Sequence, residues 1–313
     1  MDQGNCPKAV EIVEVGPRDG LQNEAYLVST ADKIALVERA IDYGARRIEV
    51  TSFVNPRRVP QMADAEAVVA GLPQRADVTY IGLALNMRGA ERAIAAGLDE
   101  VGAVCVSTDS FAMRNQGQSC AESVDVARDI VALAKASGRS ASVTIAAAFG
   151  CPFEGDVPAE HIVGMAVRAA ENGAREIALA DTIGVATPAQ VSRLVRMVRA
   201  AIAPTPVRVH FHNTRNTGIA NVWAAVSGGV SIVDASLGGL GGCPFAPGAS
   251  GNVPTEDVLY MLERSGIWTG LTIDRALAAS AWLGGVMGKS LPAMLGRAGM
   301  FPGNAATVGV KAG

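Results

Sequence analysis

The chain has 313 residues, 49% of them hydrophobic and 18% charged, with a formal net charge of −3. This length suits one α/β barrel, which typically has about 250 residues. The absence of a basic block argues against nucleic-acid binding. The absence of long apolar runs argues against a membrane span. Five scattered cysteines without a CxxC pair indicate reduced thiols, so we expect a cytoplasmic protein.

Eight strand–helix units follow one another along the chain. The predicted strands are nearly continuous apolar runs, typical of a parallel sheet buried on both faces, at residues 9–15, 47–54, 78–86, 100–107, 141–149, 175–181, 207–212 and 230–236. Helices are predicted at 30–43, 61–71, 89–97, 122–137, 159–172, from 188 onward, at 218–227 and at 256–265. An extra helix is expected at 272–288, and the tail from 296 should be loosely held.

The helix that begins near residue 188 has three consistent start signals. Thr187 is a suitable cap, Pro188 lies in the first turn, and Gln190 follows three residues after the cap. Eight such units predict a single catalytic domain over residues 1–313, a TIM (β/α)8 barrel with an extra C-terminal helical segment. A doubly wound open sheet is the alternative, but no strand is followed by GxGxxG, which argues against a dinucleotide-binding fold.

The seventh predicted strand carries two of the three histidines, His210 and His212. Because side chains alternate along a strand, both point to one face, roughly 6–7 Å apart. Two imidazoles on a buried strand cost free energy unless something satisfies them. A divalent metal ion would do so, and a pair of hydrogen-bonded core histidines is the alternative.

Other polar side chains collect at the carboxyl ends of the predicted strands. Arg18 and Asp19 follow the first strand, Glu49 lies on the second, Asp181 ends the sixth, and Cys243 and Asn252 follow the eighth. Barrel enzymes keep their active sites at this face. The clustering therefore favours an enzyme.

Asp19 and Asn252 are candidate oxygen ligands beside the histidines, because strands one and eight close the barrel next to strand seven. Nitrogen and oxygen donors without thiolate suit Mg²⁺ or Mn²⁺ better than Zn²⁺. Asp19 could instead serve a β-turn at 17–20, and Asn252 could simply belong to a loop. Arg18 could hold a developing oxyanion or form a salt bridge with Glu49.

Cys243 lies in a glycine- and proline-rich loop at 238–251, which should be exposed and able to move. A nucleophilic thiol would need a base, and the nearby histidines are assigned to the metal. We therefore expect a general acid, since an ordinary thiol has a pKa of about 8.5. An incidental surface cysteine is the alternative.

Two segments, residues 15–24 (VGPRDGLQNE) and 239–252 (GLGGCPFAPGASGN), resemble the signatures of the 3-hydroxy-3-methylglutaryl-CoA (HMG-CoA) lyases. These enzymes belong to a wider family of metal-dependent barrel lyases and condensing synthases. The resemblance runs along nearly the whole chain and includes residues 51–54, 150–152 and 181–184. The cysteine within the glycine loop favours the lyases over the synthases.

This resemblance implies a role for each candidate: Asp19, His210, His212 and Asn252 bind the metal, Arg18 holds the thioester oxygen, Cys243 supplies a proton, and Glu49 and Asp181 support the ligands. His210 or Asp19 would accept the first proton. The implied reaction is the retro-Claisen cleavage of HMG-CoA to acetyl-CoA and acetoacetate, with a divalent cation making the tertiary alcohol more acidic. An acyl-CoA substrate and a homodimer are implied as well.

The positions that would recognise the acyl group differ from the family pattern. The fifth strand has Ser142, Val143 and Thr144 where we expect an arginine, so we expect Arg215 to bind the free carboxylate of the substrate. Gln22 is the other expected substrate contact. A related tertiary-alcohol thioester such as citramalyl-CoA, a condensing synthase, and a catalytically silent binding barrel remain as alternatives.

Overall fold

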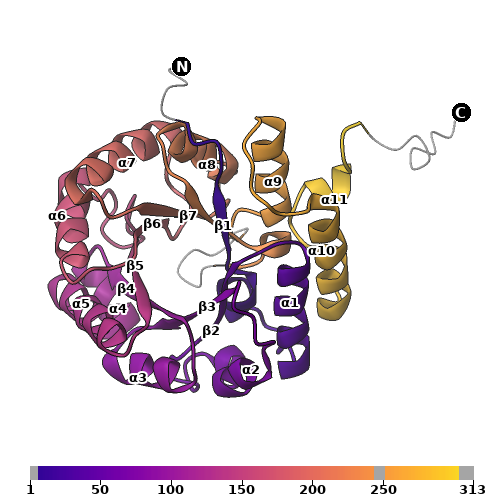
Figure 1. The fold of residues 1–313 in the computed structure, drawn as a ribbon. Helices are drawn as coiled ribbons and strands as arrows, with labels where there is room; N and C mark the ends of the chain where they lie inside the picture. The colour runs from indigo at the N-terminus through magenta and orange to yellow at the C-terminus, as the bar shows by residue number, and fades with distance from the viewer. Residues whose placement is uncertain (1–5, 243–250, 303–313) are drawn as a thin grey trace, which may run out of the picture.

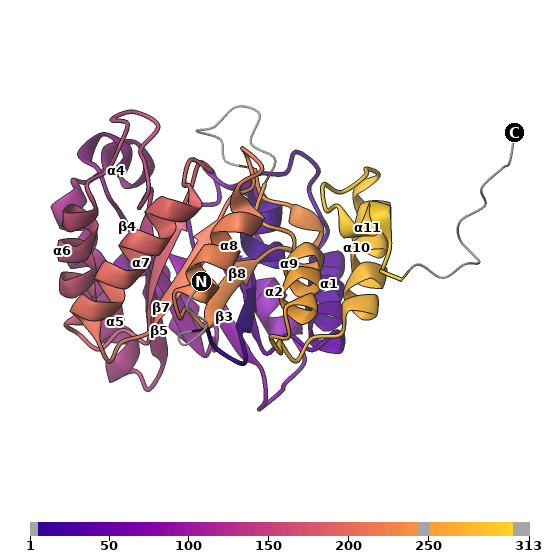
Figure 2. The ribbon, with the colours of Figure 1, turned by 90° about the horizontal axis from the view of Figure 1, so that it is seen from above.

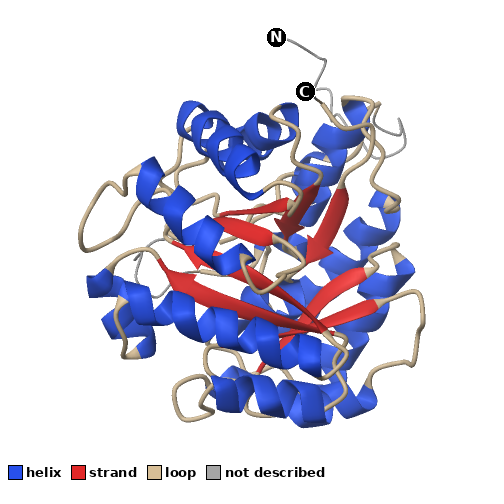
Figure 3. Cartoon of the chain, turned by 60° about the vertical axis from the view of Figure 1, so that its left-hand side comes forward, coloured by secondary structure: helices blue, strands red, loops and turns tan. Residues whose placement is uncertain are grey.

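Eight parallel strands form a closed barrel in the order β1 to β8, and β8 pairs back with β1. The structure is a computed structural model that describes residues 6–242 and 251–302. The strands form a ring with helices around it in Figure 1, and Figure 3 shows the same enclosure from another side. The predicted barrel is therefore confirmed, and the open doubly wound sheet is wrong.

All eight strands lie within the predicted apolar runs or beside them. They are β1 (Glu11–Glu14), β2 (Arg47–Ser52), β3 (Thr79–Ala84), β4 (Glu100–Val106), β5 (Ser140–Ala146), β6 (Ile177–Asp181), β7 (Val207–Phe211) and β8 (Ile232–Ala235). Side chains on their outer faces pack against the helices in one large apolar core. Such burial on both faces explains why the strands can be recognised as continuous apolar runs.

The outer layer is made of helices that follow successive strands: α1 (Thr30–Asp42), α2 (Ala65–Gly71), α3 (Met87–Ala95), α5 (Cys120–Ala136), α6 (Ala159–Ala170), α7 (Pro188–Ile202), α8 (Gly218–Ser227) and α9 (Thr255–Arg264). Helix α7 begins with the predicted capping box. Thr187 and Gln190 each accept a hydrogen bond from the backbone of the other. These two bonds satisfy amides that a helix start leaves without partners.

The predicted C-terminal helix is α10 (Ile273–Met287), which lies beside α1 on the outside of the barrel (Figure 2). The guanidinium of Arg39 on α1 lies 3.9 Å from the ring centroid of Trp282 on α10. None of the described helices has the length and apolar character that a membrane span requires.

Three elements differ from the prediction. Helix α2 begins at Ala65 rather than at residue 61, because Pro60–Met62 form a separate 3-10 turn, η3. Helix α4 (Asp109–Gln116) was not expected, since its short sequence has a weak apolar face and buries mainly Phe111 and Ala112. Within the tail expected to be loosely held, α11 (Leu295–Ala298) forms a further helical turn.

The barrel interior is ionic at the end away from its mouth. Arg47 on β2 is buried, and its Nη2 lies 2.8 Å from Glu100 Oε1 and 2.9 Å from Glu176 Oε1. Arg208 on β7 shares Glu176, with its Nη1 at 3.2 Å from the carboxylate. These buried ions need one another, since an unpaired charge at that depth would cost several kcal/mol.

Candidate active site

A cavity of about 490 Å³ opens at the carboxyl ends of the strands. The side chains in its wall that carry chemistry are those of Arg18, Asp19, Gln22, Glu49, Thr144, Thr182, Arg208, His210, His212 and Asp234. The cavity therefore lies at the face of the barrel where the sequence places the candidate residues.

Asp19, His210 and His212 form a compact cluster whose ligand atoms all lie within 4.8 Å of one another. Nε2 of His210 is 3.8 Å and Nε2 of His212 is 3.9 Å from Asp19 Oδ2. Barrel closure explains this meeting. Asp19 lies in the π-helical turn η2 (Gly16–Gly20) directly after β1, and β8 pairs with both β1 and β7.

Asn252 lies against the same cluster. Its backbone forms a bridge with His212, and its Nδ2 donates hydrogen bonds to Asp19 Oδ2 at 2.7 Å and to the carbonyl of Leu240 at 2.9 Å. Asn252 Oδ1 and His212 Nδ1 are buried and find no hydrogen-bond partner within residues 6–242 and 251–302. Buried polar atoms without partners are costly, so these two side chains keep unmet hydrogen-bonding capacity beside the cluster.

The donor set fits a divalent cation. Burial lowers the pKa of His212 to about 4, which keeps its imidazole neutral as a ligand must be. Burial would raise the pKa of Asp19, but Arg18, the two histidines and Asn252 together hold it below its usual value. One carboxylate and two imidazoles, without a thiolate, offer a cation oxygen and nitrogen ligands.

Asp234 on β8 is a candidate site residue that the sequence did not reveal. Its Oδ2 lies 3.1 Å from Nδ1 of His210, which leaves Nε2 of that ring facing Asp19. Carboxylates in this position hold the ring orientation of ligating histidines. Burial would lower the pKa of His210, but the hydrogen bond with Asp234 and the charge of Asp19 raise it. An acidic residue within the apolar run 230–236 was the available signal.

Arg18 forms the salt bridge with Glu49 that the sequence suggested, and its role toward an oxyanion stays a prediction. Its Nη2 forms a salt bridge with Glu49 Oε2 at 2.6 Å, and its Nη1 lies 2.6 Å from Asp19 Oδ1. Glu49 on β2 therefore holds the guanidinium beside the cluster. A cation fixed in this way is suited to a developing negative charge on an oxygen.

Two expected site residues, Asp181 and Arg215, form hydrogen bonds with the loop after β6. The carboxylate of Asp181 accepts hydrogen bonds from the backbone amides of Val185 and Ala186, at 2.9 and 3.0 Å. Arg215 donates to the carbonyls of Ile183 and Gly184, at 3.0 and 2.9 Å. Peptide groups of the loop thus engage both side chains, and the ligand support expected of Asp181 and the substrate contact expected of Arg215 stay predictions.

The remaining expected residues are Gln22 and Cys243. Gln22 lines the cavity, and its Oε1 accepts a hydrogen bond from Ser52 Oγ at 3.3 Å. Cys243 lies outside the described residues. Arg208, which also lines the cavity, was not singled out, although it shares its strand face with His210.

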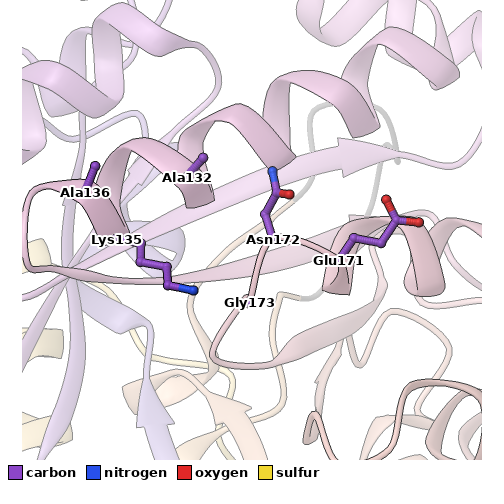
Figure 4. Close-up of a pocket in the computed structure, with 6 residues that line it drawn as sticks. All are labelled: Ala132, Lys135, Ala136, Glu171, Asn172 and Gly173. Carbon is purple, nitrogen blue, oxygen red and sulfur yellow. The ribbon is translucent and has the colours of Figure 1, made fainter.

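A second hollow lies on the outer surface, between the end of α5 and the segment after α6 (Figure 4). It is lined by Ala132, Lys135, Ala136, Glu171, Asn172 and Gly173. Both segments lead into the amino ends of strands, so this hollow lies at the end of the barrel opposite the mouth. It takes no part in the site.

Comparisons with known proteins show the family of the chain. The family model described as HMGL-like matches residues 9–282. A hydroxymethylglutaryl-CoA lyase from Bacillus subtilis is 40% identical over 91% of this chain and 96% of its own. An (R)-citramalyl-CoA lyase from Chloroflexus aurantiacus is 42% identical over 93% of this chain and 95% of its own.

Solved structures agree as well. An HMG-CoA lyase from Acinetobacter baumannii, in complex with coenzyme A and 3-methylmalate, superposes with a TM-score of 0.90 at 39% identity, covering 94% of this chain and 96% of its own. A hydroxymethylglutaryl-CoA lyase from Pseudomonas aeruginosa gives the same TM-score and identity, covering 94% and 98%. On the strength of these matches, the chain belongs to the HMGL-like family.

Proposed function

We propose that this chain is a carbon–carbon lyase that cleaves HMG-CoA to acetyl-CoA and acetoacetate. The observation that carries the proposal is the meeting of Asp19, His210 and His212 beside the fixed guanidinium of Arg18. Relatives of about 40% identity over most of the chain are named as lyases of this substrate. The cluster and Arg18 lie where they could stabilise the two oxygens that become negative in such a cleavage, the alcohol oxygen and the enolate oxygen.

The cluster would hold a divalent cation, for which we propose Mg²⁺ or Mn²⁺. Asp19, His210 and His212 would be its ligands. Asn252 is the fourth candidate, and it would bind through Oδ1 with its amide turned over, because Nδ2 faces Asp19 in the structure. When bound there, such a cation supplies Lewis-acid polarisation of the alcohol oxygen of the substrate.

The protein groups account for the other charges and protons. The alcohol proton passes to a base of the cluster, for which His210 and Asp19 are the candidates. His210 would accept it only where its Nε2 does not hold the cation, because its Nδ1 is bonded to Asp234. As the carbon–carbon bond breaks, the alcohol carbon becomes a ketone and the bonding electrons pass to the thioester as an enolate. Arg18, held by Glu49, would stabilise the enolate oxygen. We propose that Cys243 then protonates the enolate carbon, which yields acetyl-CoA.

The rim of the cavity fits the coenzyme part of the substrate. Arg58 and Arg114 are exposed and line the cavity at its mouth, where they offer positive charge to phosphate groups. Arg114 is held over the ring of Phe153, 4.1 Å from its centroid. The Acinetobacter baumannii relative, solved with coenzyme A, supports an acyl-CoA substrate.

We also propose a homodimer, which light scattering tests.

The decisive experiment is a panel of acyl-CoA thioesters incubated with the protein, with and without chelator. We expect Mn²⁺ or Mg²⁺ to restore release of acetyl-CoA and acetoacetate from HMG-CoA after chelation, and Asp19→Asn to abolish it. Cleavage of citramalyl-CoA alone, with pyruvate as co-product, would correct the substrate. Free CoA produced from acetyl-CoA and a 2-oxoacid would instead indicate a synthase, and a protein that binds neither metal nor acyl-CoA would be a silent barrel.

A further inference from the structure

Arg208 forms part of the floor of the cavity, below the histidines. It precedes His210 by two residues on β7, so its side chain has the same face of the strand and starts roughly 6–7 Å farther from the mouth. The residue is only 5% exposed, yet it belongs to the cavity wall. A buried cation at the bottom of an active-site cavity calls for an explanation.

Small side chains on the neighbouring strands leave room above this guanidinium. Ala178 on β6 is the register partner of Arg208, and Ala180 is the partner of His210. Thr144 on β5 is in turn the partner of Ala178. Thr144 and Ala180 both line the cavity. Larger residues at these positions would have separated Arg208 from the cavity.

The guanidinium has hydrogen-bonding capacity to spare. Its Nη2 donates to Thr144 Oγ1 at 3.4 Å, which is long for a hydrogen bond. Its Nε is buried and faces Asp234 Oδ1 at 3.4 Å without reaching hydrogen-bond geometry, so the spare donors are those of Nη1 and Nη2. Guanidinium groups have five N–H donors in a planar fork that matches a carboxylate.

The anions near Arg208 are each shared with another group. Glu176 lies 3.2 Å from Nη1 of Arg208 but also 2.9 Å from Nη2 of Arg47. Asp234 Oδ1 lies 3.4 Å from Nε of Arg208, while its Oδ2 faces His210 at 3.1 Å. These contacts hold the guanidinium in place without using all of its donors.

We infer that Arg208, together with the hydroxyl of Thr144, binds the free carboxylate of the acyl group and so determines which thioester is accepted. The inference rests on the proposed function, since HMG-CoA carries that carboxylate at the end away from the thioester. The coenzyme has to leave through the mouth beside Arg58 and Arg114, and the alcohol is held at the cluster. The floor is the part of the cavity left for the acyl end. Arg208 thus takes the role that we expected of Arg215.

The test compares the binding of two thioesters, measured by isothermal titration calorimetry in the presence of chelator so that neither is turned over. One is HMG-CoA, and the other is 3-hydroxy-3-methylbutanoyl-CoA, which lacks the carboxylate. We expect Arg208→Met to weaken HMG-CoA binding roughly 10- to 100-fold, the usual scale for a lost charge-assisted hydrogen bond, and to leave the other thioester unchanged. Thr144→Val should weaken the binding of HMG-CoA, but not of the other thioester, by a smaller factor. Arg208→Lys should keep part of the wild-type preference for HMG-CoA over the other thioester.

Arg47→Met is the matched control, because Arg47 belongs to the same buried ionic cluster but is absent from the cavity wall. It should lower the Tm and keep the preference for HMG-CoA. The inference is overturned if Arg208→Met weakens both thioesters equally or keeps the wild-type preference, or if Arg47→Met loses that preference too. If Arg208→Met does not fold, an unchanged preference in Thr144→Val and Arg208→Lys overturns it. Binding of HMG-CoA without its cleavage by the wild type when Mn²⁺ or Mg²⁺ is supplied would instead contradict the proposed function.

Discussion

Glu256 on α9 offers a sharp test of the buried electrostatics, because it is fully buried and lies away from the cavity wall. Its Oε2 accepts a hydrogen bond from the backbone amide of Gly238 at 2.9 Å. Burial raises the pKa of this carboxyl from 4.5 to about 7. The folded protein therefore keeps it protonated at pH values where the unfolded chain ionises it.

The sign of the effect follows from this difference in proton binding. Below pH 4.5 both states are protonated, and the contribution of Glu256 to stability is fully present. Between pH 4.5 and 7 only the unfolded chain loses the proton, so the free energy of unfolding falls as the pH rises. The raised pKa corresponds to about 3 kcal/mol lost by pH 8, since one pKa unit is worth about 1.4 kcal/mol.

Urea unfolding of the wild type and of Glu256→Gln at pH 5 and pH 8 measures this directly. Glutamine cannot ionise, so the variant should lose about 2.5 kcal/mol less than the wild type between the two pH values, because the unfolded carboxyl is already partly ionised at pH 5. Glu91→Gln, at an exposed position of α3, is the control and should follow the wild type. Equal pH dependence in the wild type and Glu256→Gln would refute the reasoning.

Two further predictions concern the packing of the site. Asp234→Asn removes the ionised partner of His210, so kcat/KM should fall about 10- to 100-fold. The circular dichroism spectrum should stay unchanged. Full activity would show that the imidazole of His210 needs no such partner. Gly241→Ala should destabilise the protein by roughly 1–3 kcal/mol, because Gly241 has φ 118° and a Cβ there would collide with the Asn252 amide. Gly97→Ala, with φ 93° and open space around it, isolates the backbone strain, and an equal fall in Tm for both variants would exclude the collision.

Much of the fold could be read from local patterns. Strands buried on both faces are mainly apolar, so the eight runs are visible without tertiary information. The start of α7 was predictable because Thr187 and Gln190 act on amides within one turn. Helix α4 was missed because its eight residues show little apolar periodicity, and it buries mainly Phe111 and Ala112, which pack with Val106, Ala147 and Cys151.

The site, like the fold, has one part that the sequence predicts and another that it does not. The spacing of His210 and His212 on one strand determined that they share a face, and the carboxyl ends of the strands determined where Arg18 and Asp19 would gather. The partners of these residues depend on which strands become neighbours in space. Asp234 meets His210 only because β8 lies between β7 and β1. Arg208 faces the cavity only because the register places Ala178 and Thr144 beside it. Alternation along a strand is local and can be read from the sequence, whereas contacts between strands are made by barrel closure, which only the tertiary structure decides.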